Sequence, residues 1–250
     1  MTDIRSPRPT ASVIVPALDE EANIVSLIAE IEAVAANPAL PVEIREIIIV
    51  DNGSTDETAA RAREAGAIVV AEPRRGYGRA CLTGAETATA EILVFMDGDR
   101  SEVPAEMPLL IGPFLNEEAG LLIGSRVRGT MEPGALSPQQ LVGNRIGSWL
   151  MRLIHGIRIT DFGPYRVLRR ETLLSFGMKE MTYGWPTEMI VRASQRGLPV
   201  IEVPVTCRRR GGGESKVSGN IRASLLTGWR MLSIMLRCWW DERRARRAAR

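Results

Sequence analysis

The sequence predicts an α/β fold in which helices cover both faces of a mostly parallel β-sheet. Short runs of apolar and β-branched residues alternate with segments of helical periodicity through the first half of the chain, and this alternation is typical of successive β-α units. The runs contain few polar residues, as expected of strands that are buried on both faces. A length of 250 residues, with 45% apolar and 25% charged residues, suits one domain with a C-terminal elaboration.

Each expected element follows from its own run of residues. The strands of the first half are expected at 12–16, 44–50, 67–71 and 92–96. Helices are expected between them, at about 23–36, 56–65 and 76–90. The second half predicts a strand at 119–124, a Gly/Pro-rich loop at 129–138, helices near 139–155 and 186–196, and a strand at 200–207. No repeat or long low-complexity segment interrupts this order, so the Gly/Pro-rich loop is interpreted as a lid or acceptor loop.

The net charge of +2 conceals a basic end of the chain. The last ten residues hold five arginines against Asp241 and Glu242, a local charge of +3, which leaves −1 for residues 1–240. Such a body does not suit general nucleic-acid binding, so no nucleic-acid partner is expected. The basic tail alone either meets anionic lipid, nucleic acid or an acidic partner, or is simply a solvated terminus.

Cysteine use and hydropathy indicate the cytoplasm. Cys81, Cys207 and Cys238 are far apart and form no CxxC pair, so neither a disulfide framework nor a zinc site is expected. The first twelve residues lack the apolar segment of a signal peptide, and no apolar stretch reaches the roughly 18 residues of a spanning helix. We therefore expect a cytoplasmic protein, either free or peripheral on the inner face of a membrane.

Acidic residues follow three of the four expected strands of the first half. Asp19 and Glu20 come after the first strand, Asp51 after the second, and Asp97 and Asp99 after the fourth. Ligands of open α/β sheets bind beyond the carboxyl ends of the strands, where these loops converge. Each acid taken alone also suits turn or helix-start chemistry. Their shared position at the strand ends predicts one site.

The segment Asp97-Gly98-Asp99 has the outline of a metal-diphosphate site. The preceding apolar strand delivers two carboxylates into one turn, and Gly98 leaves room for a ligand to approach the backbone. Mg²⁺ and Mn²⁺ favour oxygen ligands, and Mg²⁺ is commonly bound by one or two carboxylates together with substrate phosphate. The alternative interpretation is a pair of aspartates in a solvated turn.

Three segments together resemble the family 2 glycosyltransferases, and in particular the branch that contains the dolichyl-phosphate mannose synthases. They are VPALDEEAN at 15–23, IVDNGSTD at 49–56 and VFMDGD at 94–99, in the family's order and spacing. The likeness extends over about 12–220, and it includes Gly124-Ser125-Arg126 and the run RRRGGGESK at 208–216. Each motif alone is weak, whereas the three in order are specific.

The resemblance implies the Rossmann-like GT-A fold and an inverting transfer of a hexose from a UDP- or GDP-sugar. It also implies that Asp97 and Asp99 hold Mg²⁺ or Mn²⁺, which assists the departing diphosphate. Donor binding is assigned on this basis to Pro16, Ala17, Asp19, Glu20, Asp51, Gly76, Arg79, Asp97, Gly98, Asp99, Arg210 and Lys216. One alternative is a sugar-phosphate nucleotidyltransferase, which would carry a basic Gly-rich segment where this chain has acids. The other alternative is a non-catalytic nucleotide-sugar-binding protein.

Two departures from the branch bear on the metal and on the acceptor. Ser101 stands where the branch usually has a glutamine two residues after the second aspartate, which leaves the third metal ligand open. The segment at 160–166 reads TDFGPYR where mannose synthases read roughly TDxTxGFR. The acceptor is therefore left open between a polyprenyl phosphate and a small hydroxylated molecule.

The acceptor decides whether a catalytic base is needed. A phosphate monoester with a second pKa of about 6 arrives ionised, whereas an alcohol has to lose a proton to a carboxylate. Glu188 is the first candidate for the base and Asp161 is the second. Glu188 also suits a purely structural role, because Pro186 places it in the first turn of a helix.

The chain is expected to divide into a catalytic domain at 1–220 and an amphipathic helix with a basic tail at 221–250. The nucleotide-binding half is assigned to about 10–125 and the acceptor half to about 126–220. In the helix, an apolar stripe recurs at three- and four-residue spacing, made of Leu225, Trp229, Leu232, Leu236 and Trp239. This stripe is expected to dock on the catalytic domain or on a second subunit, and otherwise to lie on a membrane surface.

Overall fold

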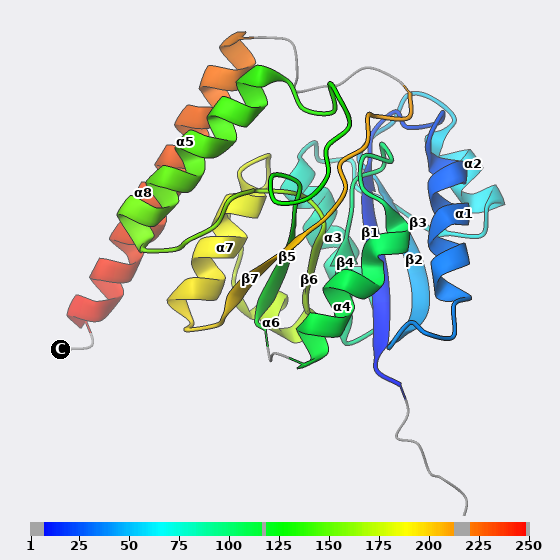
Figure 1. The fold of residues 1–250 in the computed structure, drawn as a ribbon, viewed down its shortest axis with the longest axis horizontal. Coiled ribbons are helices and arrows are strands. Elements are labelled where there is room, and N and C mark those ends of the chain that lie inside the picture. The colour runs from blue at the N-terminus through cyan, green and yellow to red at the C-terminus, as the bar shows by residue number, and fades with distance from the viewer. Residues whose placement is uncertain (1–7, 117–118, 213–220, 249–250) are drawn as a thin grey trace, which may run out of the picture.

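The structure is a computed structural model that describes residues 8–116, 119–212 and 221–248. Within these ranges the strands form one seven-stranded sheet in the order β3-β2-β1-β4-β6-β5-β7 (Figure 1). The strands are β1 (Thr10–Ala17), β2 (Glu43–Asp51), β3 (Ile68–Ala71), β4 (Ile92–Phe95), β5 (Leu121–Ser125), β6 (Arg166–Arg169) and β7 (Val200–Pro204). Every strand expected from the sequence is present, with its bounds shifted by at most three residues.

The sheet is mostly parallel, as predicted. Strand β1 pairs in parallel with β2 and β4, β2 pairs in parallel with β3, and β5 pairs in parallel with β7. Strand β6 runs antiparallel to both of its neighbours, β4 and β5. The register aligns Ala17 with Asp51 and Ile14 with Phe95. The carboxyl ends of β1, β2 and β4 therefore open on the same edge of the sheet.

Helices cover both faces of the sheet, and an apolar cluster fills each face. The helices are α1 (Ile24–Ala35), α2 (Thr58–Glu64), α3 (Tyr77–Thr87), α4 (Met107–Asn116), α5 (Pro138–His155), α6 (Arg170–Ser175), α7 (Trp185–Gln195) and α8 (Ile221–Ala248), with a short 3-10 turn at Pro104–Glu106. Val13 and Val15 of β1 pack toward α1, α2 and α4, whereas Ile14 packs toward α3, α6, α7 and α8. The alternation follows from the two-residue period of a strand.

Three elements, α4, β6 and α6, are additions to the expected order. Helix α4 contains Pro108 and Pro113, and prolines are normally read as helix breakers. Strand β6 is only four residues long and has an arginine at each end, so it shows no apolar run. Its place in the sheet comes from its antiparallel pairing with β4 and β5. Such long-range pairing cannot be predicted from the pattern of residues within the strand.

Helix α8 docks on the rest of the described fold, but mainly through residues outside the expected stripe. It packs against α5 and α7, with Ile234 and Met235 buried, whereas Trp229 and Leu236 of the stripe are exposed. The side chain of Leu225 lies outside the described residues. The expectation about the docking face was wrong because this helix carries apolar residues on more than one face, and spacing alone does not rank them.

The packing of α3 on the sheet provides a test of this arrangement. A Cβ added at Gly84 of α3 would lie 2.4 Å from Cγ2 of Ile14 and 3.1 Å from Cγ2 of Val50. Gly84→Ala is therefore expected to lower the free energy of unfolding by about 1–3 kcal/mol, because it overpacks the core. Urea denaturation followed by circular dichroism measures the change.

Gly112→Ala is the matched control for this substitution. Gly112 also lies inside a helix, but a Cβ added there would meet nothing within 4 Å. Alanine is a better helix former than glycine, so this change is expected to stabilise the protein by up to about 1 kcal/mol. Equal effects of the two substitutions would contradict the close approach of α3 to β1.

Candidate active site

A cavity of about 490 Å³ lies at the carboxyl ends of β1, β2 and β4. The predicted donor residues that line it are Pro16, Ala17, Glu20, Asp97, Gly98, Asp99 and Arg210. Asp19, Asp51, Gly76 and Arg79 were also predicted to bind the donor, but they do not line this cavity. Lys216 lies outside the described residues. The structure thus brings most of the predicted donor residues together.

Asp97 lies directly beyond β4, whose four residues are all buried. Its Oδ1 atom is buried and has no hydrogen-bond partner among the described residues, whereas its backbone N–H donates to Oε2 of Glu102 at 3.1 Å. Burial, together with the negative charge of Asp99, raises the pKa of Asp97 to about 7. Burial and mutual repulsion therefore disfavour the ionised forms of these two carboxylates. A bound cation would favour the ionised forms again.

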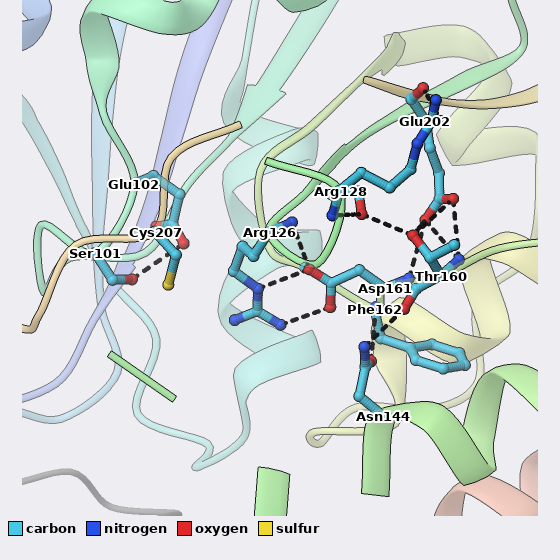
Figure 2. A network of polar contacts seen from close by, with 12 residues as sticks. Ser101, Glu102, Arg126, Arg128, Asn144, Thr160, Asp161, Phe162, Glu202 and Cys207 are labelled. Carbon is cyan, nitrogen blue, oxygen red and sulfur yellow. Dashed lines mark hydrogen bonds and ion pairs between the residues drawn. The ribbon is translucent and has the colours of Figure 1, made fainter. Parts of the chain in front are cut away.

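Glu102 is a buried carboxyl that the sequence motifs did not single out. Its side chain accepts hydrogen bonds from the Asp97 backbone and, at 3.1 Å, from Oγ of Ser101 (Figure 2). Burial raises the pKa of Glu102 well above its usual value, and the charges of Asp97 and Asp99 add to the effect. In the sequence Glu102 resembles an ordinary solvated acid, because its burial comes only from the tertiary fold.

The segment at 208–212 crosses the acidic end of the cavity. Arg210 donates from Nη1 to Oδ2 of Asp99 at 3.2 Å, and its Nη2 pairs with Glu20. The backbone N–H of Gly211 donates to the carbonyl of Asp99 at 3.0 Å, which fixes the segment against the Asp97-Gly98-Asp99 turn. The arginine predicted to bind phosphate therefore neutralises the acidic residues of the cavity.

Asp19 and Asp51 order the loops around the cavity. Oδ1 of Asp19 accepts a hydrogen bond from the backbone N–H of Thr55 at 2.7 Å, which ties the loop after β1 to the loop after β2. Oδ1 of Asp51 accepts one from the backbone N–H of Ser54 at 2.9 Å, which closes the turn after β2. The Asp51 contact is the local turn chemistry that short acidic side chains favour, whereas the Asp19 contact joins two separate loops.

Asn52 lines the cavity, although the sequence did not assign it a role of its own. Its Nδ2 donates to two backbone carbonyls of the loop after β3, and its Oδ1 accepts the backbone N–H of Gly76 at 2.8 Å. A Cβ added at Gly76 would lie 2.2 Å from the carbonyl oxygen of Met181, and its φ of 150° favours glycine. The backbone N–H of Arg79 donates to that same oxygen at 3.0 Å. Gly76 and Arg79 thus hold the entry to α3 in place.

A second cavity of about 300 Å³ adjoins the first, between α5, α7 and α8. The residues that line both cavities are Tyr77, Asp97, Arg126, Leu136, Gln140 and Tyr183. The rings of Tyr77 and Tyr183 are stacked, with their centroids 6.2 Å apart. Two adjoining cavities that meet beside a pair of carboxylates suit two substrates that react at the junction.

Arg126 reaches this junction from the end of β5, and Asp161 holds it there (Figure 2). Nε and Nη2 of Arg126 donate to the two carboxylate oxygens of Asp161, each at 2.8 Å, and the Arg126 backbone N–H adds a third bond at 2.8 Å. Burial alone would raise the pKa of Asp161, but the hydrogen bonds and charge of Arg126 outweigh it and lower the pKa. Both oxygens of Asp161 are therefore engaged.

The loop that carries Asp161 is held from two sides (Figure 2). Glu202 of β7 accepts the backbone N–H groups of Thr160 and Asp161, at 2.8 and 2.9 Å. Asn144 of α5 donates to the carbonyl of Thr160 at 2.7 Å and accepts the N–H of Phe162 at 3.2 Å. Glu202 was not anticipated, because an acid within a strand run gives no local signal of such a contact.

Glu188 of α7 is fully buried and lines neither cavity. Its Oε2 accepts the backbone N–H groups of Lys179 and Glu180 at 2.9 and 2.6 Å, and its Oε1 accepts Nη2 of Arg192 at 3.2 Å. These contacts order the loop that leads into α7. The geometry favours the structural interpretation of Glu188 over its role as a base.

The pair of Arg126 and Asp161 makes a testable contribution to stability. Asp161→Asn is expected to lower the free energy of unfolding by about 2–4 kcal/mol, because a largely buried guanidinium loses its charged partner. The control is Glu91→Gln, which removes a carboxylate from an exposed pair with Arg169 at 3.8 Å and is expected to change stability by less than about 1 kcal/mol. Urea denaturation of both variants measures the difference, and similar losses would show that the buried pair has no special role.

Comparisons with known proteins agree with this fold. Residues 12–175 match the model of glycosyl transferase family 2. An uncharacterized glycosyltransferase of Mycobacterium tuberculosis is 37% identical over 227 residues, which cover 89% of this chain and 97% of that protein. The polyprenol monophosphomannose synthase of Mycolicibacterium smegmatis is 31% identical over 240 residues, with 87% of this chain and 86% of that protein covered.

Solved structures show the same architecture. The crystal structure of glucosyl-3-phosphoglycerate synthase from Mycobacterium tuberculosis, in complex with Mn²⁺, uridine-diphosphate-glucose and phosphoglyceric acid, has a TM-score of 0.72 to this chain at 25% identity. The match covers 92% of this chain and 80% of that one. The fold is therefore of the predicted GT-A type. The family match covers well over half of the sequence, so this chain belongs to glycosyl transferase family 2 and is a glycosyltransferase.

Proposed function

We propose that this protein transfers a hexose from a UDP- or GDP-sugar to a phosphate-bearing acceptor, with inversion at the anomeric carbon and with the help of Mg²⁺ or Mn²⁺. One observation carries the proposal. The fully buried strand β4 delivers Asp97 and Asp99 into the first cavity, and Oδ1 of Asp97 is buried there with no hydrogen-bond partner among the described residues. A buried carboxylate oxygen without a hydrogen-bond partner is well suited to bind a cation.

The residues present fit a divalent cation that is shared with the donor. The described residues contain no group of three or more His, Cys, Asp or Glu side chains arranged around one point. Mg²⁺ does not require such a cage, since it usually keeps several waters and combines one or two carboxylates with substrate phosphates. Asp97 and Asp99 would hold the ion, which would neutralise the charge that develops on the departing diphosphate.

The first cavity suits the donor. Pro16 and Ala17 continue β1 into its wall, and Asn52 faces it from the loop after β2. Arg210, which now pairs with Asp99 and Glu20, is placed to exchange these carboxylates for phosphate, and Lys216 is assigned to the same anion by its place in the sequence. Asp19, Asp51, Gly76 and Arg79 contribute indirectly in this proposal, by holding the loops that form the wall.

The second cavity suits the acceptor, and Arg126 suits its phosphate. A guanidinium has five N–H donors, and Asp161 engages two of those on the Arg126 side chain, so others are left for an anion at the junction. The two named relatives support a phosphate-bearing acceptor. One is a polyprenol monophosphomannose synthase, and the other was crystallised with phosphoglyceric acid.

The state of the candidate bases also supports a phosphate acceptor. Both oxygens of Asp161 accept hydrogen bonds from Arg126, and those of Glu188 accept hydrogen bonds from two backbone N–H groups and from Arg192. Neither carboxylate is poised to take a proton. A phosphate oxygen is already ionised near neutral pH and needs no base. It would form the new bond to the anomeric carbon on the side opposite the bond to the diphosphate, which breaks.

The placement of the cavities supports a modified division of the chain. The second cavity is lined almost wholly by residues from Arg126 onward, in agreement with an acceptor half that begins at about 126. Gly228 and Met231 of α8 also line this cavity. We therefore assign the C-terminal helix to the acceptor site, in place of the separate segment at 221–250 that the sequence suggested.

Release of nucleoside diphosphate from UDP-glucose and GDP-mannose in the presence of Mn²⁺ tests the proposal. Transfer is expected to a phosphate oxygen of a polyprenyl phosphate, and not to the hydroxyl of the corresponding polyprenol. Arg126→Lys keeps the charge but loses the planar fork, so it is expected to raise the KM for the acceptor by at least about tenfold. The Kd of the donor, measured separately, is expected to change less than the KM of the acceptor, and circular dichroism serves as the control for folding. Equal transfer to unphosphorylated acceptors would reject this acceptor class.

A further inference from the structure

Helix α5 carries a row of exposed apolar side chains, which we name the α5 stripe. It consists of Val142, Ile146, Trp149 and Leu153, each between 53% and 66% exposed. Spacings of four, three and four residues put these side chains on one face of the helix. Single exposed apolar residues are ordinary, whereas a contiguous row marks a surface that binds a partner.

Helix α8 extends this surface. The two helices lie side by side at one flank of the molecule (Figure 1), and α5 turns Gly147 and Met151 inward, where both are buried. Trp229, Leu236 and Trp240 of α8 face solvent with 40–67% exposure. Each helix therefore buries one side against the protein and presents a second apolar side to the outside.

The exposed charges on these two helices are basic. Helix α5 contains no acidic residue. The acids of α8 are Asp241 and Glu242, both of which are half-buried, and Asp241 pairs with Lys179 at 3.6 Å. The exposed arginines include Arg145, Arg152, Arg230, Arg243, Arg244 and Arg247. Apolar and tryptophan side chains bordered by arginines are complementary to a partner that has an apolar interior and negative charges at its surface.

We propose that the α5 stripe and the exposed side chains of α8 bind the surface of an anionic lipid bilayer. Tryptophan side chains prefer the level of the lipid headgroups, where an apolar ring and a polar N–H are both accommodated. The helices would lie in the plane of that boundary, since no helix in the described part of the chain is long and apolar enough to cross a bilayer.

A second copy of the chain fits this surface less well. A twofold dimer brings the same patch of both subunits together. Here it would bring the arginines of one subunit toward those of the other, and α5 and α8 offer only the half-buried Asp241 and Glu242 to compensate. Lipid headgroups supply that negative charge.

The position of the acceptor cavity agrees with this orientation. The cavity is lined by Gly143 and Asn144 of α5 and by Gly228 and Met231 of α8. Val142, the first residue of the α5 stripe, is next to Gly143 in the chain. A lipid-borne phosphate in the bilayer would thus meet the cavity at the surface that binds the membrane. In this respect the inference deepens the proposed function and rests on it, but membrane binding can be measured without any substrate.

Vesicle flotation of the full chain, without donor or acceptor, tests the proposal. The protein is expected to float with vesicles of phosphatidylcholine and phosphatidylglycerol, and much less with phosphatidylcholine alone. Trp149→Ser/Leu153→Ser is expected to reduce partitioning by at least about tenfold, because two apolar anchors are lost. Val25→Ser/Leu109→Ser is the matched control, since these residues are 46% and 52% exposed on α1 and α4, and it is expected to float like the wild type.

Arg145→Glu/Arg152→Glu tests the charge, and it is expected to abolish the preference for anionic vesicles. Equal flotation of the wild type and the Trp149→Ser/Leu153→Ser variant would overturn the proposal. The proposal would also be overturned if analytical ultracentrifugation showed a dimer for the wild type and a monomer for the Trp149→Ser/Leu153→Ser variant. The surface would then bind a second copy of the chain. Transfer to a short-chain, water-soluble polyprenyl phosphate separates the two hypotheses. If the wild type transfers the sugar but does not float with anionic vesicles, the membrane proposal is rejected and the proposed function stands. If the wild type transfers to no phosphorylated acceptor, the proposed function is rejected.

Discussion

Strand β4 is buried along its whole length and leads to Asp97 and Asp99 just beyond the edge of the sheet, so two half-buried carboxylates are held close together in the wall of the first cavity. Its pairing with β1 on one side and β6 on the other fixes the position of Asp97 through the backbone. The raised pKa of Asp97 shows that the arrangement is unfavourable without a counter-charge. Arg126 supplies a positive charge to Asp97, whereas Arg210 pairs with Asp99 and ties the segment at 208–212 to the cavity.

The second half of the chain places a second cavity beside this charged edge. Strand β6 returns antiparallel beside β4, and the loop before it brings Asp161 to Arg126. Glu202 and Asn144 fix that loop from opposite sides, so Arg126 stands at the junction of the cavities without depending on a ligand. Helices α5 and α8 then line the proposed acceptor cavity and present an apolar, basic face to the outside, which links this cavity to the proposed membrane surface.

The sequence was informative wherever structure follows from neighbouring residues. The parallel strands could be predicted because each is a local apolar run, and the site because Asp97, Gly98 and Asp99 directly follow one of them. Arg126 and Asp161 are 35 positions apart in the sequence, and the loop that carries Asp161 leads into β6, which has no apolar run. No local pattern therefore predicts that these two residues pair. Burial gives Glu102 its role, and burial is a property of the whole fold. The docking face of α8 was missed because that helix has apolar residues on both sides.

The most direct test of the account is metal-dependent donor binding by a variant without the carboxylate pair. UDP-glucose and GDP-mannose are titrated into the wild type and into Asp97→Ala/Asp99→Ala, with and without Mn²⁺, and the melting temperature is followed, because a ligand of the folded state raises it. The account predicts that Mn²⁺ increases the stabilisation by the donor in the wild type and not in the variant. A variant that keeps the Mn²⁺-dependent part of donor binding would contradict it.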